Sequence, residues 1–530
     1  MGQYFNPGNE SFKRALNSQI YVDKSGIIGF TNSILNTEQS FVAVSRARRF
    51  GKSMAIGLMT AYYSKGCDSK ELFKGLKAEQ LPSFEKELNN SNVIRVDLQA
   101  FRNFAHNERR QEDGFYYMQT EVIRELSEAY PDIVKPDEIS LPTVLNRINA
   151  KTGDQFIIFI DEWDAIFREE KNNKQLQDDY IQFLRSMFKS ENAKRFIKMA
   201  YLTGILPIKK YGTQSALNNF KEYTMVAPKK LAEYIGFSEE EVKNLCEQYG
   251  MDFEECKRWY NGYSFSRAKA VYNPNSVVEA MFNQEYGSYW TKTDTFEVLR
   301  DYISMNMDGL KDSIIEMLVG RSIPLDPISF QNDMVTFNSS DDVLTLLVHL
   351  GYLAYDGKNE TARIPNQEIA LEFAAAVKTN EYWGDIAVAI KKSDALIKSV
   401  INGDADAVAK QLELVHSTQA SILTYNNENS LACAINIAFY TAFKYYSIFR
   451  ELDSGKGFAD MVYIPRPGCE FPALLIELKY NSEVDSAMRQ IKEKRYTGRL
   501  THYLDNLLMV GISYDKESKK HSCVIEAPGC

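Results

Sequence analysis

The sequence predicts an α/β protein with a parallel sheet in its first half and a second, smaller α/β domain near its carboxyl end. Short apolar runs suited to buried strands are separated by longer segments with helical periodicity; the clearest runs lie within 41–44, 92–100, 155–160 and 195–207. A Gly-Lys-Ser tripeptide follows the first run, and two acids follow the third. Near the other end of the chain, an acid and a lysine stand two positions apart on an apolar strand.

The length and composition are those of an ordinary soluble protein. A chain of 530 residues is too long for one core, so we expect two to four domains. No apolar run is long enough to span a membrane, the first residues lack a signal-peptide core, and Asn6 breaks the myristoylation pattern after Gly2. The seven cysteines form no C-x-x-C pair and the five histidines do not cluster, which indicates reduced thiols in a cytoplasmic protein without a zinc site.

The net charge of −9 argues against a chain that is coated with nucleic acid. Two basic stretches, 46–52 and 488–500, could still contact it locally. Because a run of charge is most often only a solvated face, these stretches permit nucleic-acid binding without predicting it.

The segment from Phe41 to Ser53 predicts a strand, a turn and a helix of the kind that binds phosphate. Gly51 would let backbone amides surround an anion, Lys52 would reach the β and γ phosphates, and the Ser53 hydroxyl would ligate Mg²⁺. Arg46 stands where this motif has its first glycine. Taken alone, the tripeptide fits a surface turn with a capping serine equally well.

A second motif about 110 residues later favours the phosphate interpretation. The strand in QFIIFIDEWD ends at Asp161 and Glu162, where a Walker B motif has its acids. Asp161 would hold Mg²⁺ through water, and Glu162 would polarise the attacking water. The alternative is a strand that ends in two solvated acids. The two motifs in this order predict ATP and Mg²⁺ as ligands.

Further strands complete the expected sheet. We expect one in 195–207, a possible fifth in 223–228, and a strand-like lead at Tyr21 before a helix. Thr203, at the polar end of its strand, would lie beside the nucleotide. It could sense the γ-phosphate or simply cap the strand, and the sequence favours neither role.

The middle of the chain is predicted to be helical. Between 286 and 377 a helix followed by two short strands resembles a winged-helix module, which can be a lid that reports nucleotide state or a DNA reader. The lid is favoured because the wing carries Asp356 and Glu360 and little basic charge. Two amphipathic helices are expected in 381–416, a boundary in 424–430, and a helix in 430–450.

A second chemical centre is predicted in 457–481, where two apolar strands flank a Pro/Gly turn. The alternation of a strand puts Glu477 and Lys479 on one face, with Asp460 on the facing strand. Two carboxylates could hold Mg²⁺, or Mn²⁺, and the lysine could orient or deprotonate a metal-bound water for attack on a phosphodiester. An exposed salt bridge is the alternative for this acid and lysine alone.

The first 280 residues resemble the AAA-ATPase-like proteins of bacteria. The motifs that carry the resemblance are YVDKS, RARRFGKS, IDEWD, LTGILPI, GFSEEEV, WYNGYSF and YNPNSV. It implies that arginine at position 46 is typical, and that Arg48 and Arg49 lie at the nucleotide. It assigns no arginine finger; Arg195 and the pair Arg48/Arg49 are the candidates.

The last 110 residues or so resemble the PD-(D/E)XK nuclease superfamily. The resemblance adds Glu428 as a helix-borne metal ligand, and Gln490 and Tyr496 as residues near the scissile strand. Ala459 replaces the proline for which the motif is named.

The sequence therefore predicts an α/β architecture in four parts: a P-loop NTPase domain, a helical lid with a winged-helix-like region, a helical connector, and a PD-(D/E)XK nuclease domain, at 1–235, 236–380, 381–420 and 421–530. The predicted function is ATP hydrolysis coupled to a Mg²⁺-dependent nuclease acting on nucleic acid, with DNA the expected form. The alternative is a nucleotide-switched module that binds nucleic acid or protein without cutting. We expect no membrane partner, and an oligomer is compatible with the sequence.

Overall fold

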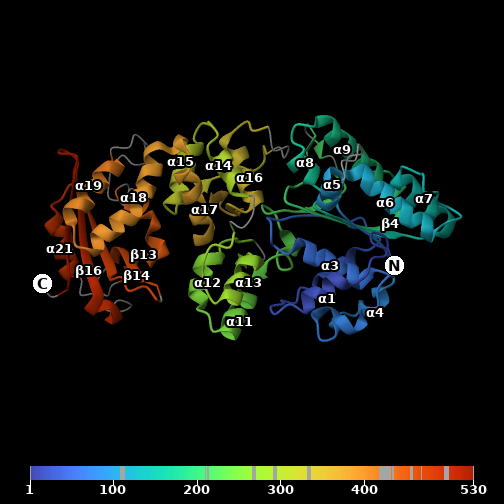
Figure 1. Cartoon of the computed structure of the whole chain (residues 1–530), viewed down its shortest axis with the longest axis horizontal. Coiled ribbons are helices and arrows are strands. Elements are labelled where there is room, and N and C mark those ends of the chain that lie inside the picture. The colour runs from blue at the N-terminus through green and yellow to red at the C-terminus, as the bar shows by residue number, and fades with distance from the viewer. Residues whose placement is uncertain are drawn as a thin grey trace. The chain divides into compact units, whose positions relative to one another are not determined.

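The computed structural model (Figure 1) divides the chain into two compact units. Unit 1 comprises Met1–Tyr289 and Pro324–Asn366, and unit 2 comprises Trp290–Ile323 and Gln367–Cys530. The structure describes residues 2–107, 114–208, 210–211, 214–215, 217–265, 270–290, 295–330, 336–416, 431, 435–453, 458–466, 468–493 and 501–528.

Unit 1 is built on a five-stranded parallel sheet in the order β2-β3-β4-β1-β7. Its members are β1 (Phe41–Ser45), β2 (Asn92–Asp97), β3 (Phe156–Asp161), β4 (Ile197–Gly204) and β7 (Lys221–Tyr223). Every residue of β1 and β3 is buried, which explains why these strands are continuous apolar runs and not alternating ones. The predicted parallel sheet is confirmed.

Helices cover both faces of this sheet (Figure 1). A large apolar core joins strand residues such as Phe41 and Ile158 to helix residues such as Leu145 and Leu184. The helices before and between the strands are α1 (Glu10–Leu16), α2 (Ile27–Ile34), α3 (Lys52–Tyr63), α4 (Phe84–Glu87), α5 (Leu98–Asn107), α6 (Gly114–Ala129), α7 (Leu141–Thr152), α8 (Ala165–Glu169), α9 (Lys174–Phe188) and α10 (Ala193–Phe196).

Two strand predictions in unit 1 were wrong in detail. The lead at Tyr21 is not a strand, because Asp23 instead accepts the backbone N–H groups of Ser25 and Lys77, at 2.8 Å each. The fifth strand ends at Tyr223 and does not run to residue 228. There the backbone N–H of Thr224 donates to the Ala227 carbonyl at 3.2 Å and closes a turn.

The rest of unit 1 holds two small helical groups. The first contains β8 (Phe237–Ser238), α11 (Glu239–Tyr249), α12 (Phe253–Tyr260), β9 (Val271–Tyr272) and α13 (Pro274–Asn283). The predicted capping box at Ser238 and Glu241 is confirmed. The second is α16 (Ser340–Leu350) followed by the antiparallel pair β11 (Ala354–Asp356) and β12 (Thr361–Arg363), the expected winged-helix-like arrangement.

Unit 2 contains a five-stranded mixed sheet in the order β13-β14-β15-β16-β17. Only β15 and β16 run parallel, and α21 connects them. Its elements are α14 (Thr295–Ile303), α15 (Leu310–Leu318), α17 (Gln367–Lys378), α18 (Gly384–Ile401), α19 (Ala405–His416), β13 (Tyr446–Asp453), β14 (Phe458–Pro465), β15 (Ala473–Tyr480), α21 (Val484–Glu493), β16 (Leu507–Asp515) and β17 (Lys520–Glu526).

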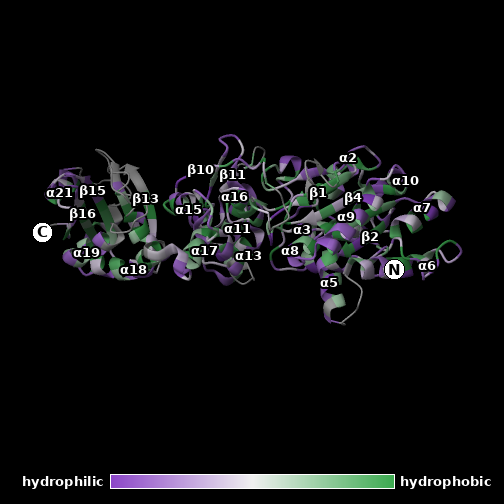
Figure 2. Ribbon diagram, turned by 90° about the horizontal axis from the view of Figure 1, so that it is seen from above, coloured by the Kyte–Doolittle hydropathy of each residue, from purple (hydrophilic) through white to green (hydrophobic). Residues whose placement is uncertain are grey.

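The core of this sheet is apolar, and β15 and β16 are coloured hydrophobic in Figure 2. The side chain of Met488 on α21 lies against Gly511 of β16, where a Cβ atom would come within 3.1 Å of the methionine sulfur. The absence of a side chain at Gly511 therefore lets α21 pack directly on the sheet.

The prediction of a helix through residues 430–450 was wrong in its second half. Residues 446–453 form the strand β13, which pairs with β14. The run YSIFRELD does not alternate strictly between apolar and polar side chains, so its pairing with β14, and not a local pattern, makes it a strand. The predicted hairpin of β14 and β15 is confirmed.

Candidate phosphate and metal sites

The first candidate site lies at the carboxyl end of β1. The chain turns after Ser45 and begins α3 at Lys52, with left-handed backbone at Arg49 (φ 66°) and Gly51 (φ 90°). The Lys52 ammonium is buried and donates to the carbonyls of Arg46 and Ala47, at 3.1 Å each. Burial lowers the pKa of Lys52, although nearby carboxylates oppose this effect. A cation thus lies beside the first turn of a helix, as phosphate binding requires.

Arg46, the residue in place of the first glycine, is a structural part of the loop. Its side chain is fully buried, and Nη1 donates to the carbonyls of Thr224 at 2.8 Å and Tyr223 at 3.3 Å. The guanidinium lies 5.5 Å from the ring centre of Phe265. Burial lowers the pKa of Arg46 to about 10. The arginine therefore ties the loop to the segment after β7.

Asp161 and Thr203 lie beside each other because of the strand order. β4 separates β1 from β3, and its Thr203 pairs with Val44 of β1. The Thr203 hydroxyl donates to Asp161 Oδ1, and the backbone N–H of Glu162 donates to the same oxygen at 3.1 Å. Both bonds reach Oδ1. Among the described residues, the other oxygen of Asp161, Oδ2, accepts no hydrogen bond and can bind a cation. The structure thus places the Thr203 hydroxyl against Asp161, and its place beside a nucleotide stays a prediction.

Glu162 lies between two cations. Its backbone is left-handed (φ 51°), and its carboxylate accepts Arg168 Nη2 at 2.5 Å while lying 3.9 Å from Lys52 Nζ. Burial raises the pKa of Glu162, against the effect of Lys52 and Arg168. A carboxylate with a raised pKa next to the phosphate-binding lysine suits a general base.

Asp164 and Arg168 were missed by the sequence analysis. Asp164 is fully buried, and its Oδ2 accepts the backbone N–H groups of Ile205 and Leu206 at 3.0 and 2.8 Å. It thereby fixes the loop that follows β4. Arg168 Nε lies 3.3 Å from the same oxygen. The sequence feature that could have revealed this pair is its spacing of four residues, which puts the acid and the arginine on one helical face.

The other residues predicted for the first site are not all located at it. Ser53 is exposed in the first turn of α3, and Arg48 and Arg49 lie in the loop, half-buried and exposed. Arg195 does not join this group: it is exposed in α10, which precedes β4, so it lies at the opposite end of the strand from Thr203.

The residues at this site fit Mg²⁺ and a phosphate group chemically. Oxygen donors of a carboxylate and a hydroxyl are those that Mg²⁺ prefers, and it usually keeps several waters as well. Asp161 and Ser53 would hold the metal, and Lys52 would hold the phosphates.

The second candidate site lies on β14, β15 and α21. Met461 pairs with Ile476, and Asp460 and Glu477 occupy the next positions along the two strands. Asp460 Oδ2 accepts the backbone N–H of Leu478 at 2.7 Å. The structure therefore brings the two predicted carboxylates to adjacent strands, where they suit Mg²⁺.

Lys479 and Gln490 both contact Glu477. The side chain of Glu477 is fully buried, Lys479 Nζ lies 3.7 Å from its Oε1, and Gln490 Nε2 donates to the same oxygen. A buried carboxylate needs such partners, since an unpaired charge in the interior is costly. The ion pair is thus not the exposed salt bridge of the alternative interpretation.

Two predicted residues, Glu428 and Tyr496, lie outside the described residues. Within the described ranges, no group of three or more His, Cys, Asp or Glu side chains gathers as a metal site. In the same ranges, no helix is long and apolar enough to cross a membrane.

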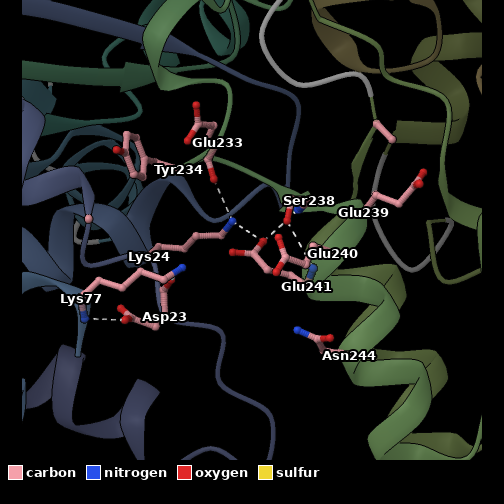
Figure 3. A pocket seen from close by; sticks show the side chains of 12 residues that line it. Asp23, Lys24, Lys77, Glu233, Tyr234, Ser238, Glu239, Glu240, Glu241 and Asn244 are labelled. Atoms are coloured by element: carbon pink, nitrogen blue, oxygen red, sulfur yellow. Dashed lines mark hydrogen bonds and ion pairs between the residues drawn. The ribbon is translucent and has the colours of Figure 1, made fainter. Parts of the chain in front are cut away.

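A pocket of about 670 Å³ lies between the YVDKS and GFSEEEV segments (Figure 3). Lys24 points into it and donates to the Glu233 carbonyl at 2.8 Å and to the Glu241 carboxylate at 2.5 Å. Glu241 also closes the capping box of α11 with Ser238. These contacts give both segments a structural role, since they join the loop around Lys24 to α11.

Family models match two parts of the chain. Residues 8–213 match the model described as Predicted AAA-ATPase, and residues 427–523 match the PD-(D/E)XK nuclease superfamily. An uncharacterized protein in the vnfD 5' region of Azotobacter chroococcum mcd 1 is 22% identical over 287 residues, which are 54% of this chain and 52% of that protein. The chain spans about half the length of this curated relative.

Two solved structures are similar at low identity. Cdc6p from Pyrobaculum aerophilum is 9% identical with a TM-score of 0.27, over 69% of this chain and 97% of that one. ORC1 from Aeropyrum pernix, solved in complex with DNA, is 10% identical with a TM-score of 0.26, over 72% of this chain and 98% of that one. The parallel sheet and the two family models together show an AAA-ATPase-like domain at residues 8–213 and a domain of the PD-(D/E)XK nuclease superfamily at residues 427–523.

Proposed function

We propose that unit 1 binds and hydrolyses ATP with Mg²⁺, and that this cycle controls a Mg²⁺-dependent phosphodiesterase in unit 2 that acts on nucleic acid, with DNA the expected form. Mn²⁺ would substitute for Mg²⁺ in the second site. We further propose that the protein works in the cytoplasm, and that oligomers are compatible with this activity.

The observation that carries the ATPase proposal is the convergence of Lys52, Asp161, Glu162 and Thr203 at one end of the sheet. Bound Mg²⁺ would neutralise charge on the phosphate oxygens. Lys52 would exchange its two loop carbonyls for phosphate oxygens, which are stronger acceptors for an ammonium group. Glu162 would accept a proton from the attacking water.

The nuclease proposal is supported by the buried Glu477 with its lysine, its glutamine and the neighbouring Asp460. Mg²⁺ held by the two carboxylates would lower the pKa of a bound water and polarise the phosphodiester. Lys479 would orient that water, and Gln490 would keep the Glu477 carboxylate in place. Glu428 and Tyr496 stay predictions for the same site.

Calorimetry with ATP tests the first half. Lys52→Ala should weaken ATP binding at least tenfold, because an ammonium–phosphate contact is worth more than about 1.4 kcal/mol in a buried site. Lys65→Ala, which removes an exposed lysine just beyond α3, should bind ATP as the unmodified protein does. Equal affinity in Lys52→Ala and the unmodified protein would refute the phosphate-loop assignment.

Cleavage assays test the second half. The unmodified protein should cut single- or double-stranded DNA with Mg²⁺ or Mn²⁺, and Asp460→Ala and Lys479→Ala should each abolish cutting. Lys516→Ala, an exposed lysine after β16, is the control. If the unmodified protein cuts nothing with either metal, the alternative function stands: a nucleotide-switched module that binds without cleaving.

A further inference from the structure

Arg168 is the residue of the first site that the mechanism above leaves unused. It lies on α8, six positions after Glu162, and its side chain is only 6% exposed. Its guanidinium contacts three carboxylates: Glu162 at 2.5 Å, Asp164 at 3.3 Å and Glu169 at 3.7 Å. The position of Asp164 is itself fixed by the backbone of the loop after β4. Asp164 therefore fixes one side of the guanidinium, and the other side binds Glu162.

The contacts of Glu162 differ in strength. The oxygen toward Arg168 makes a short, charge-assisted hydrogen bond, whereas the oxygen toward Lys52 lies at 3.9 Å, beyond hydrogen-bond distance. When Lys52 binds a phosphate group, Glu162 loses its weaker contact, the one with Lys52, and keeps the stronger contact with Arg168. Arg168 then remains as the group that fixes the direction of the carboxylate.

We propose that Arg168 is a positioning residue for ATP hydrolysis: it holds the Glu162 carboxylate in the correct direction toward the attacking water. The inference rests on the proposed ATPase function. It assigns to Arg168 no contact with the nucleotide, which separates it from an arginine finger. The geometry makes the role necessary, because among the described contacts of the Glu162 carboxylate with cations only the one to Arg168 is within hydrogen-bond distance.

The proposal predicts which kinetic constants change. Arg168→Gln should lower kcat at least tenfold, since a displaced general base loses much of its effect. KM and the Kd for ATP should stay within about twofold, because the phosphate contacts are intact. Arg168→Lys keeps a positive charge and a donor toward Glu162, so it should restore kcat in part.

A matched control is Arg102→Gln. Arg102 on α5 forms an arginine–glutamate pair of similar geometry, 2.8 Å from Glu170, the residue that directly follows α8. It contacts none of the proposed catalytic residues. Arg102→Gln should leave kcat, KM and the Kd for ATP unchanged. Thermal unfolding of all three variants at neutral pH checks that each one folds.

The experiment is steady-state ATP hydrolysis by the full chain at neutral pH, with Kd from calorimetry. The inference is overturned if Arg168→Gln keeps the kcat of the unmodified protein, or if Kd, KM and kcat all deteriorate and Arg168→Lys restores nothing. A third result, no hydrolysis by the unmodified chain, would refute the proposed function itself and remove the basis of the inference.

Discussion

His349 makes the stability of unit 1 depend on pH. It lies near the end of α16, only 3% exposed, and its ring stacks on Phe330 with centroids 5.5 Å apart. Its Nδ1 has no hydrogen-bond partner among the described residues. Burial, together with the positive charge of Arg46, lowers the pKa of His349 to about 3. The folded protein therefore holds this imidazole neutral throughout the physiological range.

The sign and size of the effect follow from linkage. The unfolded chain binds a proton at His349 below its ordinary pKa of about 6.5, while the folded chain does not until about pH 3. Stability is complete above pH 6.5 and falls by about 1.4 kcal/mol for each pH unit below it. At pH 5 the loss is about 2 kcal/mol, which lowers the melting temperature of a unit of this size by roughly 3 °C.

The assay is thermal unfolding of the full chain at pH 7.5 and pH 5.0. His349→Gln cannot titrate, so its melting temperature should fall about 3 °C less between the two pH values than that of the unmodified protein. Phe330→Leu removes the stacking partner and keeps the imidazole, so it should retain the full pH dependence. If His349→Gln and the unmodified protein lose the same stability on acidification, the imidazole is not kept neutral by the fold.

Three other substitutions give independent checks. Gln490→Ala should weaken Mg²⁺ binding in unit 2 by roughly 10- to 100-fold in calorimetry, because a side chain that orients the Glu477 carboxylate is lost. Gly262→Ala should lower the free energy of unfolding by more than about 3 kcal/mol in denaturant titrations, since φ is 129° and a Cβ atom would lie 2.1 Å from the Pro365 carbonyl oxygen. Lys24→Met should cost about 1–3 kcal/mol in the same assay, because Glu241 would keep its charge without its cation.

Matched variants separate these effects from general damage. Gly153→Ala also changes a left-handed glycine (φ 77°), but nothing lies within 4 Å of the added methyl, so about 1 kcal/mol is expected. Lys70→Met breaks an exposed pair with Glu85 and should leave the stability unchanged within the error of the assay. Equal losses within either pair of variants would contradict the structural explanation, as would unchanged Mg²⁺ affinity in Gln490→Ala.

Several parts of the structure were predictable because their signals in the sequence are local. Buried parallel strands are continuous apolar runs, so β1, β3 and β4 were recognisable, and the acids or hydroxyl at their ends could be assigned to one edge of a sheet. The two-residue period of β15 put Glu477 and Lys479 on one face. The capping box of α11 was visible for the same reason, since its partners lie three residues apart.

Tertiary structure alone decided which distant groups meet. The burial of Arg46 depends on carbonyls that lie 177 and 178 residues further along the chain. The roles of Asp164 and Arg168 depend on the loop after β4 and on the direction of the Glu162 carboxylate, and a local pattern specifies neither. The sequence shows that a residue carries a charged side chain. The partner of that side chain, its burial and hence its pKa are set only when the strands are ordered and packed.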